Sequence, residues 1–168
     1  MRLDKITGTL GTTVYLDGEL IAEDVAVSLP PITFAETEIQ GGGGSITVPL
    51  YPLPQNLEAS ITFRGQSEGF AAALASAGQQ VEIRWAVSQL QPDQSSRVVG
   101  MKAFLTGIPR SLPGPSLGVG EAEELEVSWT VTRYQLVRDG ETIVLIDKLA
   151  GKVELNGKDY AADLSALL

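Results

Sequence analysis

The stretch TVTRYQLVRDGETIVLIDKLAGKVELNGKDY, residues 130–160, carries two turn signals between strand-like runs. The dipeptide Asp139-Gly140 separates the first pair of runs, and Asn156-Gly157 separates the second. Both dipeptides suit a two-residue type I′ turn, because they tolerate the positive φ angles that its two central positions require. The end of the chain is therefore predicted to form a long strand, two tight hairpins and a short tail.

Strands are predicted along most of the remaining chain. Asp17-Gly18 is a further hairpin signal near the N-terminus. Polar and apolar residues alternate, as in half-buried strands, at Leu57–Arg64 and Val81–Leu90, and Arg97–Ile108 is predicted to be the antiparallel partner of the second run. A long irregular connection is expected over residues 107–120, which contain three prolines.

The longest strand signal covers Glu121–Leu136. Its apolar side chains occupy every second position up to Val131, and the pattern then resumes one residue out of step at Tyr134 and Leu136. A shift by one residue predicts either a bulge or a strand that passes from one packing environment to another.

Two helices are expected beside these strands. Ser67–Ala77 begins with a capping serine, places Phe70, Leu74 and Ala77 on one face, and is followed by Gly78. The tail, Tyr160–Leu168, is predicted to form a second, short helix. The fold class is therefore mainly β: an antiparallel β-sandwich or barrel in one domain, residues 1–168, with one flanking α-helix and a short C-terminal helix.

Composition excludes several kinds of site. The chain has no cysteine, so thiolate catalysis, thiolate metal sites and disulfides are excluded, and it has no histidine, so a Ser-His-Asp triad cannot form. A net charge of −9 disfavours binding to nucleic acid phosphates. No apolar run is long enough to span a membrane, and no signal-peptide core follows Met1–Lys5. Neither membrane insertion nor a cofactor is predicted.

The densest carboxylate cluster is a candidate catalytic or calcium site. It consists of Glu121, Glu123, Glu124 and Glu126. A paired-carboxylate hydrolase needs two acids facing a cleft with separated pKa values, and a calcium loop needs EF-hand spacing, and neither feature is evident here. A solvated strand face is the preferred interpretation, so the chain is not predicted to be an enzyme.

A flexible loop is expected around residues 38–46. Four consecutive glycines, Gly41–Gly44, precede Ser45, and glycine loses much conformational entropy when it becomes ordered. A phosphate-binding loop is disfavoured, because no Lys-Ser or Lys-Thr pair follows and Ile46–Val48 resembles a strand instead of the start of a helix.

Several of these segments together resemble a known family. The run from Arg133 to Asp147, followed by Asn156-Gly157, looks like the C-terminal part of the major tail tube protein of contractile-tailed bacteriophages. Val14–Gly18 and the following Val27–Pro30 are similar to the opening hairpin and next strand of that family. The resemblance covers most of the chain in order, and its C-terminal part is the most specific.

The resemblance implies a structural protein. Six protomers would close into a ring by joining their sheets, and rings would stack into the hollow tube inside a sheath, as in phage-derived bacteriocins and the type VI secretion tube. The implied partners are other copies of the chain, the tail sheath protein, the baseplate and the tail terminator proteins. DNA or effectors would pass through an acidic lumen without specific binding, and the protein would belong to the virion after assembly in the cytoplasm of the host bacterium.

Two segments are predicted to make the assembly contacts. The stacking loop between rings would be Gln40, Gly41, Gly42, Gly43, Gly44 and Ser45. The C-terminal hairpin, with Tyr134, Leu136, Asp139 and Gly140, would contact a neighbouring subunit. A monomeric ligand-binding β-barrel or sandwich remains the alternative.

Overall fold

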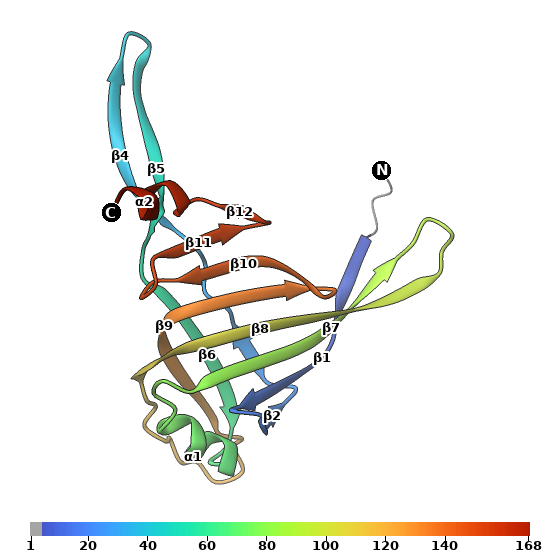
Figure 1. Cartoon of the computed structure of the whole chain (residues 1–168). Helices are drawn as coiled ribbons and strands as arrows, with labels where there is room; N and C mark the ends of the chain where they lie inside the picture. The colour runs from blue at the N-terminus through green and yellow to red at the C-terminus, as the bar shows by residue number, and fades with distance from the viewer. Residues whose placement is uncertain (1–4) are drawn as a thin grey trace.

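The computed structural model describes residues 5–168 as an assembly of antiparallel strands with two short helices (Figure 1). Residues 1–4 lie outside this range, so most of the Met1–Lys5 segment, which is not predicted to begin a signal peptide, is not described. The elements are β1 (Lys5–Leu16), β2 (Glu19–Glu23), β3 (Ala26–Ser28), β4 (Phe34–Gly41), β5 (Gly44–Pro54), β6 (Leu57–Arg64), α1 (Glu68–Leu74), β7 (Gln80–Leu90), β8 (Ser96–Ser111), β9 (Glu124–Arg138), β10 (Glu141–Asp147), β11 (Lys152–Leu155), β12 (Lys158–Asp159) and α2 (Ala162–Leu167).

The predicted type I′ turns are confirmed. Asp139 and Gly140 have φ angles of 48° and 83°, and they join β9 to β10. Asn156-Gly157 and Asp17-Gly18 show the same pair of positive φ angles and join β11 to β12 and β1 to β2. The local chemistry of these dipeptides therefore fixes three of the reversals in the fold.

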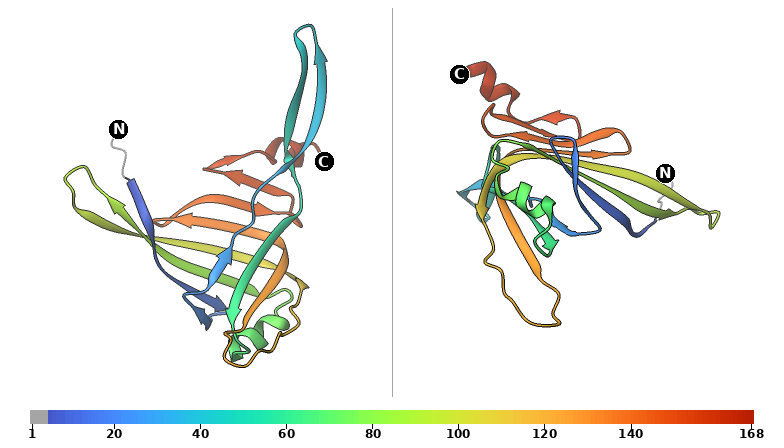
Figure 2. Two further views of the ribbon diagram at one scale, coloured as in Figure 1. Left: turned by 180° about the vertical axis from the view of Figure 1, so that it is seen from behind. Right: turned by 90° about the horizontal axis from the view of Figure 1, so that it is seen from below.

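One large sheet runs in the order β12-β11-β10-β9-β8-β7-β1-β2, and β6 and β3 branch from β9. The predicted mainly β, antiparallel fold with two helices is confirmed, and the sheet stays open instead of closing into a barrel. The left view of Figure 2 shows that β3 and β6 pass across the face of β7 and β8. Apolar side chains from both layers form a single core cluster between them, including Ile61 and Phe63 of β6 and Val81 and Ile83 of β7.

The predicted change of environment along the longest strand is also confirmed. β9 pairs with β8 on one side, but on the other side its first half pairs with β6 and its second half with β10. The register against β8 shifts between Thr106 and Gly107, which face Arg133 and Val131, so Thr132 bulges out. A side chain at Gly107 would collide with the carbonyl oxygen of Thr130, so only glycine fits at this shift. The bulge lets one strand join both layers of the core.

The first helix is shorter than predicted, and only part of its predicted apolar face is buried. Ser67 caps it as expected, accepting a hydrogen bond of 3.1 Å from the backbone N–H of Phe70. Phe70 is buried as predicted, and Ala73 and Ser76 are buried too, but Leu74 is exposed, as is Ala77, which lies beyond the end of the helix. The Ser76 hydroxyl accepts a hydrogen bond of 2.8 Å from the Trp129 indole N–H, which fixes the end of the helix to β9.

Two predicted segments have different strand bounds in the structure. Around residues 38–46, where a flexible loop is predicted, strand β4 continues to Gly41, β5 begins at Gly44, and only Gly42 and Gly43 form the turn. The connection predicted to begin at Gly107 begins after Ser111, because β8 keeps its pairing with β9 to that point. Pro109 is tolerated there because the pairing of β8 with β7, its other neighbour, extends only as far as Thr106, which lies opposite Gln80.

Candidate assembly surfaces

The β4–β5 hairpin forms a separate two-stranded sheet that projects from the body of the protein (Figure 1). Side chains directly opposite each other across an antiparallel pair share a face. One face is therefore mainly apolar and includes the opposed pairs Ala35–Leu50, Thr37–Val48 and Ile39–Ile46. The other face is polar and includes Glu36–Pro49, Glu38–Thr47 and Gln40–Ser45. The residues predicted as a stacking loop, Gln40–Ser45, form the exposed tip.

An aromatic cluster holds the base of this hairpin. The rings of Phe34 and Tyr51 meet edge to face with centroids 5.1 Å apart, and the ring of Tyr51 lies 4.8 Å from that of Tyr160. The ammonium group of Lys158 lies 5.0 Å from the Tyr160 ring centroid. These contacts tie the hairpin to the C-terminal segment. These contacts were not predicted, because Tyr51 and Tyr160 are far apart in the chain.

The large sheet leaves a long strand edge without a partner among the described residues. β1 pairs with β7 along its length, but β2 covers only Thr13–Leu16 on the other side. The rest of that edge, from Lys5 to Gly11, carries the exposed side chains of Ile6 and Leu10. Two register shifts interrupt it. An unpaired edge presents backbone donors and acceptors that can pair with another chain.

The C-terminal hairpin is divided between core and surface. Tyr134 is buried in the core cluster, and Leu136 packs against that cluster. Burial raises the pKa of the Tyr134 hydroxyl to about 12. Asp139 and Gly140 are exposed at the turn, where the Asp139 carboxylate lies 2.9 Å from the guanidinium of Arg97. The two apolar residues of this predicted subunit contact thus belong to the protomer's own core, and the turn remains accessible.

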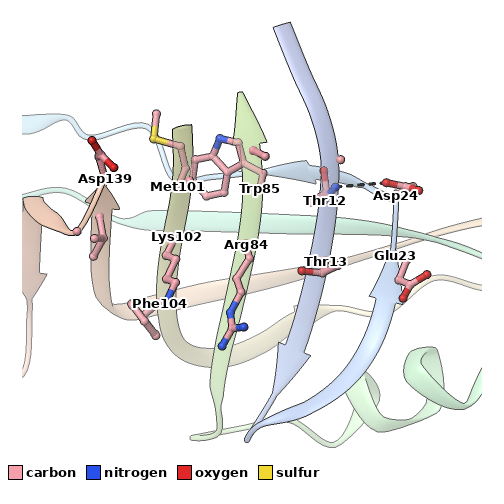
Figure 3. A pocket seen from close by; sticks show the side chains of 15 residues that line it. Thr12, Thr13, Glu23, Asp24, Arg84, Trp85, Met101, Lys102, Phe104 and Asp139 are labelled. Atoms are coloured by element: carbon pink, nitrogen blue, oxygen red, sulfur yellow. Dashed lines mark hydrogen bonds between the residues drawn. The ribbon is translucent and has the colours of Figure 1, made fainter. Parts of the chain in front are cut away.

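A groove of about 950 Å³ crosses the sheet beside this turn (Figure 3). Arg84 and Lys102 project from adjacent strands on the same side. The Arg84 guanidinium lies 2.6 Å from the Glu82 carboxylate, and this hydrogen bond raises the pKa of Arg84 above its ordinary value. The carboxylate of Asp24 accepts a hydrogen bond of 3.3 Å from the backbone N–H of Thr12. The lining offers charged and aromatic contacts to a ligand, but no histidine or cysteine for nucleophilic or acid–base chemistry.

The acidic cluster near the start of β9 lies mainly at the surface. Glu121, Glu124 and Glu126 are exposed, as the interpretation of a solvated face requires, and Glu123 is half-buried. No group of three or more carboxylate, histidine or cysteine side chains in residues 5–168 is arranged to hold a metal ion. Within the same residues, neither helix has the length and apolar character needed to cross a membrane.

Comparison with known proteins supplies the family. A family model described as phage tail tube protein FII matches residues 10–168, which is nearly the whole chain. None of the curated proteins compared with the chain matches it. The matched region includes the opening hairpin, the projecting β4–β5 hairpin and the divided strand β9. The chain therefore belongs to the phage tail tube protein FII family.

Proposed function

We propose that six copies of this chain close into a ring and that the rings stack into the hollow tube of a phage tail or a phage-tail-like injection particle. Membership of the family makes the chain a structural component of the tail tube that assembles with copies of itself. The observation that carries the finer proposal is the open sheet, whose free edges, including Lys5–Gly11 of β1, are available to a neighbouring copy.

Joining sheets in a closed ring would use up these edges. A free edge in a monomer invites uncontrolled pairing, and closure removes it. The two register shifts along β1 twist its edge and disfavour pairing with a flat, unrelated strand. The exposed Asp139-Gly140 turn is a further contact that we assign to the neighbouring subunit, while the projecting tip, Gln40–Ser45, is assigned to the stacking of rings.

Charge supports a role as a conduit. The chain carries a net charge of −9, and the segment from Ile6 to Phe63 has seven acidic residues and no lysine or arginine. An acidic lumen would repel DNA phosphates and let the nucleic acid pass without binding. The tail sheath, the baseplate and the tail terminator are the further partners we assign to the tube. We place its assembly in the cytoplasm of the host bacterium.

Electron microscopy of the purified protein at increasing concentration and salt tests this proposal. We expect rings or tubes of constant diameter, formed more readily at high salt, because salt screens the repulsion between strongly acidic copies. A species that stays monomeric under all these conditions, and that binds a small ligand in the groove lined by Arg84 and Lys102, would support the alternative of a monomeric binding module.

A further inference from the structure

The apolar face of the β4–β5 hairpin has no cover within the described chain. Ile39 and Ile46 lie directly opposite each other and are 49% and 62% exposed, and Leu50 on the same face is also exposed. A two-stranded sheet gains little stability in water on its own. Burial of this face against another surface would therefore stabilise the hairpin as well as the contact.

The hairpin is better suited to dock by a face than by an edge. Addition of a strand to a free edge needs regular backbone N–H donors, and prolines have none. β5 contains Pro49, Pro52 and Pro54 within its last six residues. β4, on the other edge, carries Glu36 and Glu38, whose charges disfavour close pairing of strands. These features leave the apolar face as the favoured contact surface.

A second exposed apolar surface lies at the opposite end of the molecule. The connection between β8 and β9 exposes Leu112, Leu117 and Val119, and the nearby helix α1 exposes Leu74. Figure 1 and the left view of Figure 2 both show this connection and α1 at the end remote from the β4–β5 hairpin. A surface at each end of one chain is what a head-to-tail contact between copies requires.

We propose that the apolar face of the β4–β5 hairpin packs on the connection containing Leu112, Leu117 and Val119 in the next copy along the tube. This inference rests on the proposed stacking of rings, and it names the two surfaces that meet. The occupant is a second copy because the family assembles with itself and because both apolar surfaces occur on this chain. A head-to-tail contact of this kind also gives the tube a direction.

The size of the hairpin face indicates when this contact forms. β4 has eight residues. At a rise of roughly 3.3 Å per residue and a width of roughly 10 Å for two strands, the face covers about 260 Å². A stable pair of proteins needs about 800 Å² from each partner. One hairpin therefore cannot hold two isolated protomers together, whereas the hairpins of a whole ring act together and their contacts add. Stacking should require preformed rings.

Cysteine cross-linking tests which surfaces meet, and the absence of native cysteine makes the chain suitable. In tubes of the double variant Ile46→Cys/Leu117→Cys, a short bismaleimide should join successive copies into a ladder of multimers. The matched control is Thr47→Cys/Leu117→Cys, in which the hairpin cysteine lies on the polar face, and it should give little cross-linking. Tubes that form but give dimers only, no products, or equal yields in both variants would overturn the proposal.

Charge insertion provides a second test that does not need cross-linking. Ile39→Glu should leave rings intact but shorten or abolish tubes, because a buried, unpaired carboxylate weakens each contact by roughly tenfold or more. Thr47→Lys places a charge on the polar face, opposite Glu38 and outside the tip, and should leave the tubes intact. Normal tubes from Ile39→Glu, including tubes that fail only to bind the sheath, would overturn the contact between copies. Failure of the unaltered chain to form rings would instead count against the proposed function.

Discussion

The β4–β5 and β9–β10 hairpins have the same connectivity and opposite surroundings. In β9–β10, Tyr134 and Ile146 lie directly opposite each other and are 3% and 0% exposed. In β4–β5, Ile39 and Ile46 form the equivalent opposed pair and are 49% and 62% exposed. One apolar pair stabilises the protomer, and the other is left free. An apolar pattern in a hairpin therefore does not reveal by itself whether it serves the fold or the assembly.

The largest expected difference between the two hairpins concerns core stability. Ile146→Ala should lower the free energy of unfolding by about 2–5 kcal/mol, because it removes a fully buried side chain and leaves a cavity. Ile46→Ala should change that free energy by less than about 0.5 kcal/mol, since its side chain is already in water, and should impair stacking instead. Urea unfolding of the unassembled protein measures both values. Similar losses in the two variants would show that the hairpins do not differ in this way.

The next largest effect is a loss of stability at high pH, caused by ionisation of Tyr134. Its folded-state pKa of about 12 lies above the ordinary value of 10.0 because burial disfavours the phenolate. A raised folded pKa means that the stabilisation is fully present below pH 10 and is lost as pH rises toward 12. A shift of about two units corresponds to about 3 kcal/mol. Urea unfolding between pH 9 and about 12 should show this loss, and Tyr134→Phe should reduce it by that amount.

Tyr51 lies at the base of the projecting hairpin and is 40% exposed. Tyr51→Phe is the matched control, because it removes a tyrosine hydroxyl without the same burial. The free energy of unfolding of each variant is compared with that of the unaltered chain as pH rises. If it falls as much in Tyr134→Phe as in Tyr51→Phe and in the unaltered chain, the assignment of the effect to burial of Tyr134 is wrong.

Much of the β9–β10 region could be predicted from the sequence, because its signals are local. The Asp139-Gly140 dipeptide specifies its turn, and the change of apolar phase between Val131 and Tyr134 marks the bulge at Thr132. The partners of β9 could not be predicted. Its switch from β6 to β10 depends on pairing between segments far apart in the chain.

The β4–β5 hairpin escaped prediction for related reasons. A Gly-Gly pair can form a two-residue hairpin turn, but four consecutive glycines do not specify which pair turns, and a run of glycines is also typical of flexible loops. Its anchor, the contact between Tyr51 and Tyr160, joins two distant segments. The helix face was predicted only in part: Phe70 is buried as expected, but α1 ends at Leu74, so Ala77 lies beyond it. The sequence placed the candidate stacking residues in one segment, but not on the tip of a strand pair.

The turns of the two hairpins should differ less, in the stability that each loses when a glycine is replaced by alanine. Gly140 has a φ of 83°, and Gly140→Ala should cost about 1–2 kcal/mol because a Cβ disfavours this left-handed conformation. Gly42 has no positive φ, and a Cβ there would meet nothing within 4 Å. Gly42→Ala should therefore leave the stability of the protomer within about 0.5 kcal/mol of the original. Thermal unfolding measures the two effects, and a larger loss for Gly42→Ala would mean that the glycine run is needed for more than the turn.

The smallest effect should come from the ion pair that links the β9–β10 turn to β8. Arg97 and Asp139 are 2.9 Å apart, but their side chains are 51% and 58% exposed, so water and salt screen their attraction. Asp139→Asn is the suitable variant, because asparagine tolerates the φ of 48° at this position and leaves the turn unstrained. The free energy of unfolding should fall by less than about 0.5 kcal/mol at low salt and by nothing measurable in about 1 M salt. A loss above about 1 kcal/mol that persists at high salt would mean that Asp139 holds the turn through its geometry, and the accessible turn would then be as much a part of the protomer's fold as Tyr134.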